Sequence, residues 1–476
     1  MNRAILFSAL VSCSVFAKEI SPGADLRAEF NALQPGGELV LTGGTYTLPD
    51  GRFGVTASGT ERAPIVIRAK DGEHVHLVRP DAKQNLIDLD AVAWLELRGI
   101  EFSGGSAGIR IGKAQHLTIA DCEVHSTGDV AIRANDPGET YESLQLLRNH
   151  LHHTDGTGEG MYLGCNTDGC RVSNSLIAGN WIHHTNGPLV TQGDGIEVKE
   201  GSSGNVIRDN VIHDTRYPCI ITYSAAGHGP ANVIERNLLW NCGDHGIQAA
   251  SDAVIRNNII LSAAIDGIAM RQHQSTLPEN LVVVNNTVLH AGVDAVSLRN
   301  PTGPVVIANN ALYGQGGLAL KFIGDPSRLT FSGNVGEGRV DVATLMPGSL
   351  AADLVNASST GGLPSDPFPR SGGALLGAGD AAHLPQDDFN GTPRNGVADV
   401  GAYAFAQSNS GWVLSDGFKP LTTPATPDAG VPDGGQTPDA APGASAEPEG
   451  GCGCSSVGAV PLLAALLPLL RRKARD

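Results

Sequence analysis

The stretch Val206-Ile207-Arg208-Asp209-Asn210 combines a short aliphatic strand with an asparagine, and similar stretches recur along the chain. The recurring asparagines are Asn149, Asn180, Asn210, Asn237, Asn258, Asn286, Asn310 and Asn334, spaced 31, 30, 27, 21, 28, 24 and 24 residues apart. A repeat of roughly 20 to 50 residues, built on β-branched strands without helical spacing, indicates a solenoid. One coil cannot bury its apolar face alone, so stacked coils form the core.

The repeated asparagine is expected at the same corner of every coil. Its amide can hydrogen-bond to the copies above and below, and asparagine tolerates the left-handed backbone that a sharp corner needs. We therefore predict an all-β fold: a single-stranded right-handed parallel β-helix solenoid with an N-terminal helical cap.

The ends of the solenoid follow from changes in the repeat. Within residues 18–35, Leu26, Phe30 and Leu33 have helical spacing and predict a short helix that caps the open end. Coils are expected over residues 36–345. Residues 346–415 lose the period, and their Asp387–Tyr403 part resembles the closing segment of many secreted parallel β-helix proteins, so we expect a structural role.

The N-terminus and the cysteines indicate export. Residues 1–17 have a basic start, an apolar run and small residues near Ala17, which is typical of a signal peptide. In an oxidising compartment, Cys165 and Cys170 can pair across a short loop. We expect Cys122, Cys219 and Cys242 to be unpaired core residues.

The C-terminus predicts a linker and an anchor. Residues 416–450 are rich in Pro, Ala, Gly, Thr and Asp and predict a disordered linker. Residues 451–476 combine a Gly-Cys-Gly-Cys motif, an apolar run and a basic end. This pattern resembles the C-terminal sorting tag of myxobacterial surface proteins, which implies membrane attachment and display on the outer cell surface. An ordinary tail anchor is the alternative.

Charge limits the partners. The net charge of −17 argues against nucleic acid. Aligning coils on Val130, Met161, Ile196, Ile220, Ile247, Ile268 and Val296 gives two outward columns. The first column is Ala131, Tyr162, Glu197, Ile221, Gln248, Ala269 and Ser297, and the second is Arg133, Gly164, Lys199, Tyr223, Ala250, Arg271 and Arg299. A basic stripe on an acidic chain suits a linear polyanion such as a uronate polysaccharide. The alternative is a solvated surface with unrelated basic residues.

The stretch from Thr191 to Asn210 resembles polysaccharide lyase family 6, whose members are parallel β-helix enzymes that cleave alginate or chondroitin. The resemblance rests on Val198-Lys199 at a strand end, followed by Asn205 and the ladder asparagine Asn210. It implies that Lys199 is the base that removes the C5 proton of a uronate.

The same resemblance implies calcium, held by Asp194 with Glu197, at the substrate carboxylate. Two departures stand out: Gln192 replaces an expected acidic residue, and Tyr223 lies where the family has an arginine. Tyr223 can donate a proton to the leaving oxygen. Glu197 beside Lys199 favours the ammonium form, so a simple ion pair is the competing interpretation.

Two further patterns are weaker. His152, His183 and His213 follow the ladder asparagines at a fixed distance, and they either bind a transition metal or fill corners by hydrogen bonding to backbone. Asn166–Gly169 and Gly227–Gly229 resemble fragments of pectin-hydrolysing glycosidases. The paired aspartates of that family are missing between them, and acid–base hydrolysis needs two carboxylates.

Together these patterns predict an exported, monomeric polysaccharide lyase that cleaves an acidic glycan by β-elimination. Lys199 and Tyr223 would be catalytic, and Asp194 and Glu197 would bind calcium. Arg133, Tyr162, Arg271 and Arg299 would contact substrate. The alternative is a non-catalytic adhesion protein that uses the solenoid as a rigid stalk, because a fold alone does not fix function.

Overall fold

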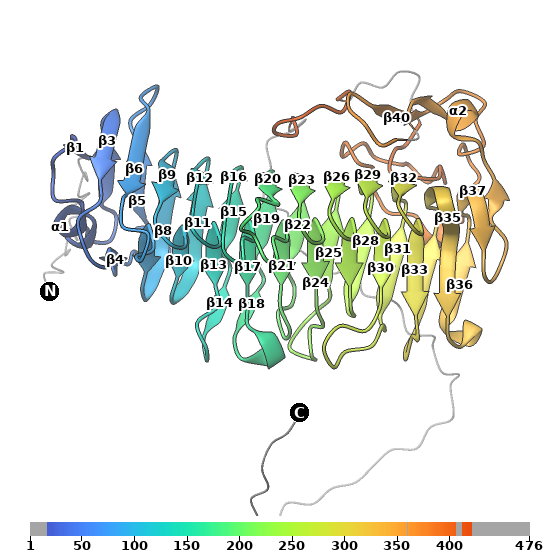
Figure 1. The fold of residues 1–476 in the computed structure, drawn as a ribbon, viewed down its shortest axis with the longest axis horizontal. Helices are drawn as coiled ribbons and strands as arrows, with labels where there is room; N and C mark the ends of the chain where they lie inside the picture. Colours follow the sequence, from blue (N-terminus) through green and yellow to red (C-terminus); the bar gives the residue numbers. More distant parts are fainter. Residues whose placement is uncertain (1–16, 359, 406–411, 421–476) are drawn as a thin grey trace, which may run out of the picture. The chain divides into compact units, whose positions relative to one another are not determined.

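A computed structural model of the chain describes residues 17–358, 360–405 and 412–420. These residues form a parallel β-helix whose coils follow one another along the axis (Figure 1). This confirms the predicted fold class. Nearly all of the predicted signal peptide, most of the predicted linker and the whole predicted sorting tag lie outside the described residues. Within the described part of the chain, no helix is long and apolar enough to cross a membrane.

Three parallel ladders build the solenoid. Sheet 1 stacks β1 (Lys18–Ile20), β2 (Glu38–Leu41), β5 (Ile65–Ala69), β8 (Val92–Arg98), β11 (Ala114–Ala120), β15 (Gln145–Leu147), β19 (Leu176–Ala178), β22 (Val206–Arg208), β25 (Asn232–Glu235), β28 (Ala253–Arg256), β31 (Leu281–Val284), β34 (Val305–Ala308) and β36 (Leu329–Ser332). β14 (Thr140–Glu142) and β18 (Arg171–Ser173) pair beside it.

Sheet 2 follows sheet 1 in every coil. It stacks β3 (Gly44–Thr47), β6 (Val75–Arg79), β9 (Glu101–Gly104), β12 (Glu123–His125), β16 (His150–His152), β20 (Trp181–Thr185), β23 (Val211–Thr215), β26 (Leu238–Cys242), β29 (Ile259–Ala263), β32 (Thr287–Ala291), β35 (Ala311–Ile323), β37 (Val335–Val340) and β38 (Met346–Pro347).

Sheet 3 completes the coil. It stacks β4 (Gly54–Val55), β7 (Ile87–Leu89), β10 (Ile109–Ile111), β13 (Ile132–Ala134), β17 (Met161–Leu163), β21 (Ile196–Val198), β24 (Ile220–Thr222), β27 (Ile247–Ala249), β30 (Ile268–Met270) and β33 (Val296–Arg299). The long strand β35 pairs with both β32 and β33, so it joins sheets 2 and 3 at the C-terminal end.

Stacked aliphatic side chains fill the interior. In sheet 1, Ile177, Ile207 and Ile234 lie in register on successive coils, and all three are fully buried. Complete burial of such a side chain contributes about 1.5–3 kcal/mol. The repetition of these contacts along the axis explains how short strands of three to five residues hold together.

The predicted asparagine ladder is confirmed. Each ladder side chain from Asn149 to Asn310 donates to the carboxamide oxygen of the next, at 2.9–3.1 Å. The expectation that these asparagines adopt the left-handed conformation is wrong. The residue before each ladder asparagine does so instead, for example Arg148, Asp209 and Asn257 with φ near +55°. The turn is thereby made one residue earlier, which leaves the ladder amide directed inward.

Removing one ladder amide should substantially lower the free energy of unfolding. The Asn237 oxygen accepts from the backbone N–H and the side chain of Asn210, and its amide donates to Asn258 and to the Ile207 carbonyl. Asn237→Ala leaves these buried groups unpaired, so we expect a loss of about 3 kcal/mol, since each such group costs about 1–3 kcal/mol. Urea unfolding measures this loss. Gln145→Ala, at an exposed position, should change stability little, and an equal loss in both variants would contradict the ladder's role.

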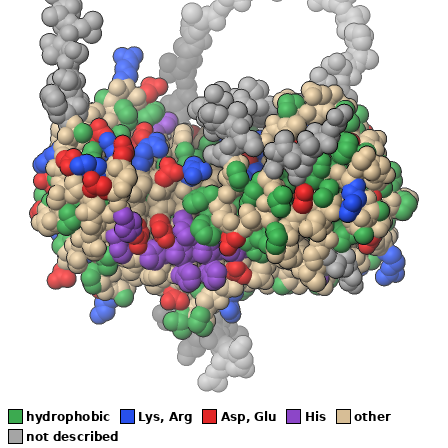
Figure 2. Space-filling model, turned by 90° about the horizontal axis from the view of Figure 1, so that it is seen from above, with side chains coloured by type: hydrophobic (Ala, Val, Ile, Leu, Met, Phe, Trp, Pro, Cys, Tyr) green, Lys and Arg blue, Asp and Glu red, His purple; other side chains and the backbone are tan. Residues whose placement is uncertain are grey.

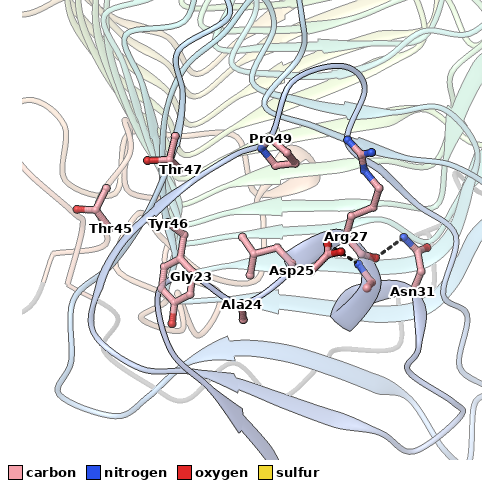
Figure 3. A pocket seen from close by; sticks show the side chains of 11 residues that line it. Gly23, Ala24, Asp25, Arg27, Asn31, Thr45, Tyr46, Thr47 and Pro49 are labelled. Atoms are coloured by element: carbon pink, nitrogen blue, oxygen red, sulfur yellow. Dashed lines mark hydrogen bonds between the residues drawn. The ribbon is translucent and has the colours of Figure 1, made fainter.

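A short helix covers the N-terminal end of the solenoid. α1 (Leu26–Asn31) buries Leu26 and Phe30 against the first coils, as the helical spacing predicts. Its neighbours line the cavity of about 710 Å³ in Figure 3, where Asp25 caps the helix by accepting from the Ala28 N–H. Apart from Asp25 and Arg27, the residues around this cavity carry no charge, so we assign it no role.

After β38, the described residues 350–358, 360–405 and 412–420 pack along the outside of sheet 2 rather than over the end of the coils. This segment contains α2 (Leu350–Asp353) and an antiparallel pair, β39 (Leu354–Asn356) and β40 (Asp366–Pro369). Its apolar side chains form a second core with outward residues of β23, β26, β29 and β32. Lys419, in the predicted linker, is buried and donates to Asp209.

Two disulfides stabilise the loops. Cys165 pairs with Cys170, as the sequence allowed. The prediction that Cys219 and Cys242 are unpaired is wrong, because they form a disulfide between adjacent coils. Cys242 is the last residue of β26 and pairs in register with Thr215 of β23. The turn that follows β23 brings Cys219 back to the same corner, next to Cys242. Cys122 is buried and unpaired, as predicted.

Candidate active site

The register of sheet 3 places most, but not all, predicted site residues together. Lys199 and Tyr223 occupy the same position on successive coils, since the N–H of Lys199 bonds to Leu163 and that of Tyr223 to Val198. Arg271 directly follows β30 and Arg299 is the last residue of β33, and the two lie at equivalent places because Met270 pairs with Leu298. The predicted second column therefore holds from Lys199 onward.

The placement of Arg133 in that column is wrong. Ile132, not Val130, pairs with Met161, so Arg133 lies beside Tyr162 and Glu197 in the first column. The error was two residues, and a two-residue shift leaves the alternation of inward and outward side chains unchanged. The hydrophobic pattern alone could therefore not reveal the misalignment of the coil that contains Arg133. Arg133 lies 3.6 Å from Asp129.

The side chains of Lys199, Tyr223 and Glu197 form one polar cluster on the outward face of sheet 3, and all three are buried. The Lys199 ammonium contacts the Glu197 carboxylate and donates to the Tyr223 hydroxyl at 3.1 Å. The Tyr223 hydroxyl donates to Glu197 at 2.9 Å. The ring of Tyr162 packs 4.5 Å from the Lys199 nitrogen, so aromatic faces surround the cation.

The protonation of this cluster reflects burial and pairing. Burial disfavours the ammonium, but the charge and hydrogen bond of Glu197 outweigh it and raise the pKa of Lys199. Burial also raises the pKa of Tyr223, and the Glu197 charge adds to the shift. Both shifts favour an ammonium on Lys199 and a neutral phenol on Tyr223. The sequence raised one objection to Lys199 as a base, namely that Glu197 favours its ammonium form. The structure contains this pair.

Three buried carboxylates adjoin the lysine. Glu159, Asp194 and Glu197 place one oxygen each within 4.8 Å of one another. Asp194 and Glu197 were predicted ligands, whereas Glu159 was missed. Glu159 lies two residues before Met161 as Asp194 lies two before Ile196, and these strands pair. Correct alignment of the coils was therefore the signal that could have found it.

These carboxylates repel one another. Burial raises the pKa of Glu159 to about 7. Burial, with the charges of Glu197 and Glu159, raises the pKa of Asp194 well above its usual value. One oxygen of Glu159 and one of Glu197 are buried without a hydrogen-bond partner. A hard cation with oxygen ligands, such as calcium, satisfies both the charge and the orphan oxygens, so the residues fit the predicted metal.

A loop covers the cluster. The Gln248 amide donates to His273 Nδ1 at 3.1 Å, which leaves the His273 proton on Nε2 and directs it to the Tyr223 hydroxyl, 2.7 Å away. Gln274 and Thr276 fasten the loop to Asn166 and Glu200 at 2.9 Å each. Lys199 and Tyr223 are consequently only 3% exposed.

Basic side chains flank the cluster on both sides. Among the described residues, Arg271 and Arg299 take part in no ion pair, and the Nε of Arg299 is buried without a partner. Toward the N-terminal coils, Arg133 lines a surface groove of about 460 Å³. The other basic residues of this groove are Arg52, Lys83 and Arg110. Arg52 and Arg110 also pair with Asp88, so their charges are partly compensated.

The two fragments that resemble pectin-hydrolysing glycosidases do meet in space. His228 lies 2.7 Å from the Asp168 carboxylate, which also accepts from Arg171. Arg171, with His228, lowers the pKa of Asp168. A general acid needs the opposite shift, so this pair is suited to fastening loops rather than to hydrolysis.

Comparison with known proteins supports the fold. A family described as a right-handed β-helix region matches residues 176–335. Pectate lyase PEL9 of Emericella nidulans is 30% identical over 180 residues, which are 36% of this chain and 38% of that protein. The structure of XylC with xylose superposes with a TM-score of 0.56 at 9% identity, over 82% of this chain and 98% of that one. An alginate lyase from Paenibacillus sp. str. FPU-7 gives a TM-score of 0.46 at 18% identity, over 66% of this chain and 99% of that one.

The chain is thus a right-handed parallel β-helix protein. It matches less than half the length of the pectate lyase, so that enzyme's activity is not transferred by the match alone.

Proposed function

We propose that this protein is a polysaccharide lyase that cleaves a uronate-containing glycan by β-elimination. The observation that carries the proposal is the cluster on sheet 3, where Lys199 and Tyr223 are hydrogen-bonded next to three buried carboxylates. A base, a proton donor and a cation site are what β-elimination from a uronate requires. The partial likeness to a pectate lyase supports the same class of reaction.

The proposed reaction balances with this chain's own groups. Lys199, in its neutral form, takes the C5 proton, the C5–H electrons form the C4–C5 double bond, and the C4–O bond breaks. The leaving oxygen takes the Tyr223 proton. The ammonium of Lys199 lies 3.1 Å from the Tyr223 oxygen, so it can return the proton and restore both groups.

Calcium would be held by Glu159, Asp194 and Glu197, and when bound it supplies positive charge that stabilises the developing enediolate. Lys199 can release its proton only when the charge of Glu197 is compensated. The ion pair between Lys199 and Glu197 therefore has to be relieved before Lys199 can act as the base.

Substrate access requires the His273 loop to move. The loop is fastened by two side-chain hydrogen bonds, from Gln274 and Thr276, each of modest strength. An anionic glycan would replace the loop over sheet 3, with Arg271 and Arg299 on one side. The groove at Arg133 and the ring of Tyr162 would continue the binding surface on the other side.

Arg271 should affect binding more than chemistry. Replacing it by glutamine removes a charge-assisted contact worth about 1.5–3 kcal/mol, which corresponds to a rise in KM of about 10- to 100-fold. We expect kcat to change little. Arg328→Gln, at an exposed position beyond the same end of sheet 3, is the matched control. Equal KM values for Arg271→Gln and wild type would exclude Arg271 from substrate binding.

The proposal is tested by incubating the full chain, with calcium or with a chelator, with alginate, pectate, chondroitin and hyaluronan. The unsaturated uronate product absorbs in the ultraviolet, so a rise in absorbance on one glycan supports elimination and identifies the substrate class. Binding to a glycan without any rise, by folded protein in calcium, would contradict the proposal and favour the adhesion alternative.

A further inference from the structure

Histidines cover the outer face of sheet 2, away from the candidate active site. Figure 2 shows a purple patch of histidines in the left half of this view. They occupy neighbouring outward columns on β6, β12, β16, β20 and β23, and β9 contributes Glu101 to the same face. The stacked rings of His125, His152, His183 and His213 are 4.9–5.1 Å apart.

The same outward face changes character along the axis. Beyond β20, the column that contains His150 and Trp181 continues with Val211, Leu238 and Ile259. These apolar residues are covered by described residues from 350–358, 360–405 and 412–414. The covering segment ends near Trp181 and His150: Asp416 accepts the indole N–H of Trp181, and the Phe418 ring lies 6.2 Å from the His150 ring. The histidine half keeps partial exposure, with side chains of His76, His125, His150 and His152 between 13% and 22% exposed.

The first cluster contains His76, Glu101 and His125. One oxygen of Glu101 lies 3.2 Å from His76 Nε2 and 3.0 Å from His125 Nε2. The three ligand atoms lie within 4.8 Å of one another. The other ring nitrogen of His125 lies 3.0 Å from the Ser126 hydroxyl, an outer contact that holds the ring with Nε2 toward Glu101.

The second cluster, on the next coil, repeats this arrangement with Glu123, His150 and His152. One oxygen of Glu123 lies 2.9 Å from His152 Nε2 and 3.4 Å from His150 Nδ1. The outer nitrogen of His152 contacts His153 at 2.6 Å, which again holds Nε2 toward the carboxylate. The Nε2 of His150 lies 2.8 Å from His183 Nε2, a contact that leaves His150 Nδ1 toward Glu123.

We propose that the outer face of sheet 2 carries two transition-metal sites of the zinc class, one at His76, Glu101 and His125 and one at Glu123, His150 and His152. Two imidazoles and one carboxylate are a ligand set that zinc accepts and that calcium does not favour. The alternative was that His152, His183 and His213 fill corners by bonding to backbone. Among the described residues, their ring nitrogens instead contact carboxylates, an indole and other histidine rings.

Isothermal titration with ZnCl2 tests the proposal independently of any lyase activity. The full chain should carry no added histidine tag, and Cys452 and Cys454 should be replaced by serine, because thiolates also bind zinc. Calcium in excess keeps the carboxylate cluster on sheet 3 occupied. We expect two zinc ions per chain, one in either His125→Ala or His152→Ala, and none in the double variant.

His116→Asn is the matched control, because it removes a histidine that stacks on Trp94 in sheet 1, outside both clusters, and asparagine tolerates its left-handed backbone. It should bind two zinc ions. Circular dichroism confirms that each variant is folded. Stoichiometry that is unchanged in the double variant, or no zinc bound by the unsubstituted histidine face, would overturn the proposal.

Discussion

Replacing Lys199 by methionine is expected to abolish glycan cleavage while the coils remain folded. Methionine keeps the apolar stem between the rings of Tyr162 and Tyr223 but cannot accept a proton. A general base contributes about 100- to 10,000-fold, so turnover should fall by about 1000-fold or more. Tyr223→Phe, which loses only the hydroxyl, should fall within the same range. Initial rates of ultraviolet absorbance at saturating substrate measure both losses.

The matched control for Lys199 is Lys113→Met. Lys113 is a surface lysine that pairs with Glu139 at 3.4 Å and lies away from the cluster. Its replacement should leave turnover within about twofold of wild type, because an exposed ion pair contributes only about 0–1 kcal/mol. Undiminished turnover in a folded Lys199→Met protein would show that Lys199 is not the base.

Calcium is expected to stabilise the wild-type protein and to have little effect on Glu159→Gln. A ligand at 100 times its dissociation constant adds about 2.7 kcal/mol to the free energy of unfolding. Glu159→Gln removes one of three carboxylates and should weaken calcium binding by about 100-fold, since a hydrogen-bonded charge contributes about 1.5–3 kcal/mol. Thermal unfolding with calcium and with chelator measures the difference.

In the presence of chelator, the order of stability of Glu159→Gln and wild type should reverse. Glu159→Gln relieves repulsion among Glu159, Asp194 and Glu197, so the variant should unfold at the same or a higher temperature than wild type. Glu139→Gln controls for loss of an acidic side chain elsewhere. If calcium stabilised Glu159→Gln as much as wild type, the carboxylate cluster would not be the calcium site.

The repeat predicted most of the fold because each ladder asparagine can have its hydrogen bonds satisfied in only one arrangement of the coils. A buried carboxamide at every corner finds partners only if the coils stack in register, and the observed ladder meets that requirement from Asn149 to Asn334. The same regular spacing correctly brought Lys199 and Tyr223 onto neighbouring coils. The sequence could not place Arg133, because a two-residue insertion preserves the inward–outward alternation.

Other features depend on loop conformation, which has no period. The disulfide between Cys219 and Cys242 required knowledge of where the turn after β23 returns. The His273 loop, which closes over Tyr223, likewise cannot be predicted from the pattern of strand residues. Glu159 differs from these, because it lies at a repeated position and follows from the coil alignment once Met161 and Ile196 are paired.

The most direct test of the central claim is the mass spectrum of the cleavage products of an acidic oligosaccharide. Elimination adds no water, so the masses of the two fragments should sum to that of the substrate, and Lys199→Met should yield neither fragment. Fragments that together exceed the substrate by one water molecule would indicate hydrolysis. That result, or unchanged fragments from Lys199→Met, would contradict β-elimination by this site.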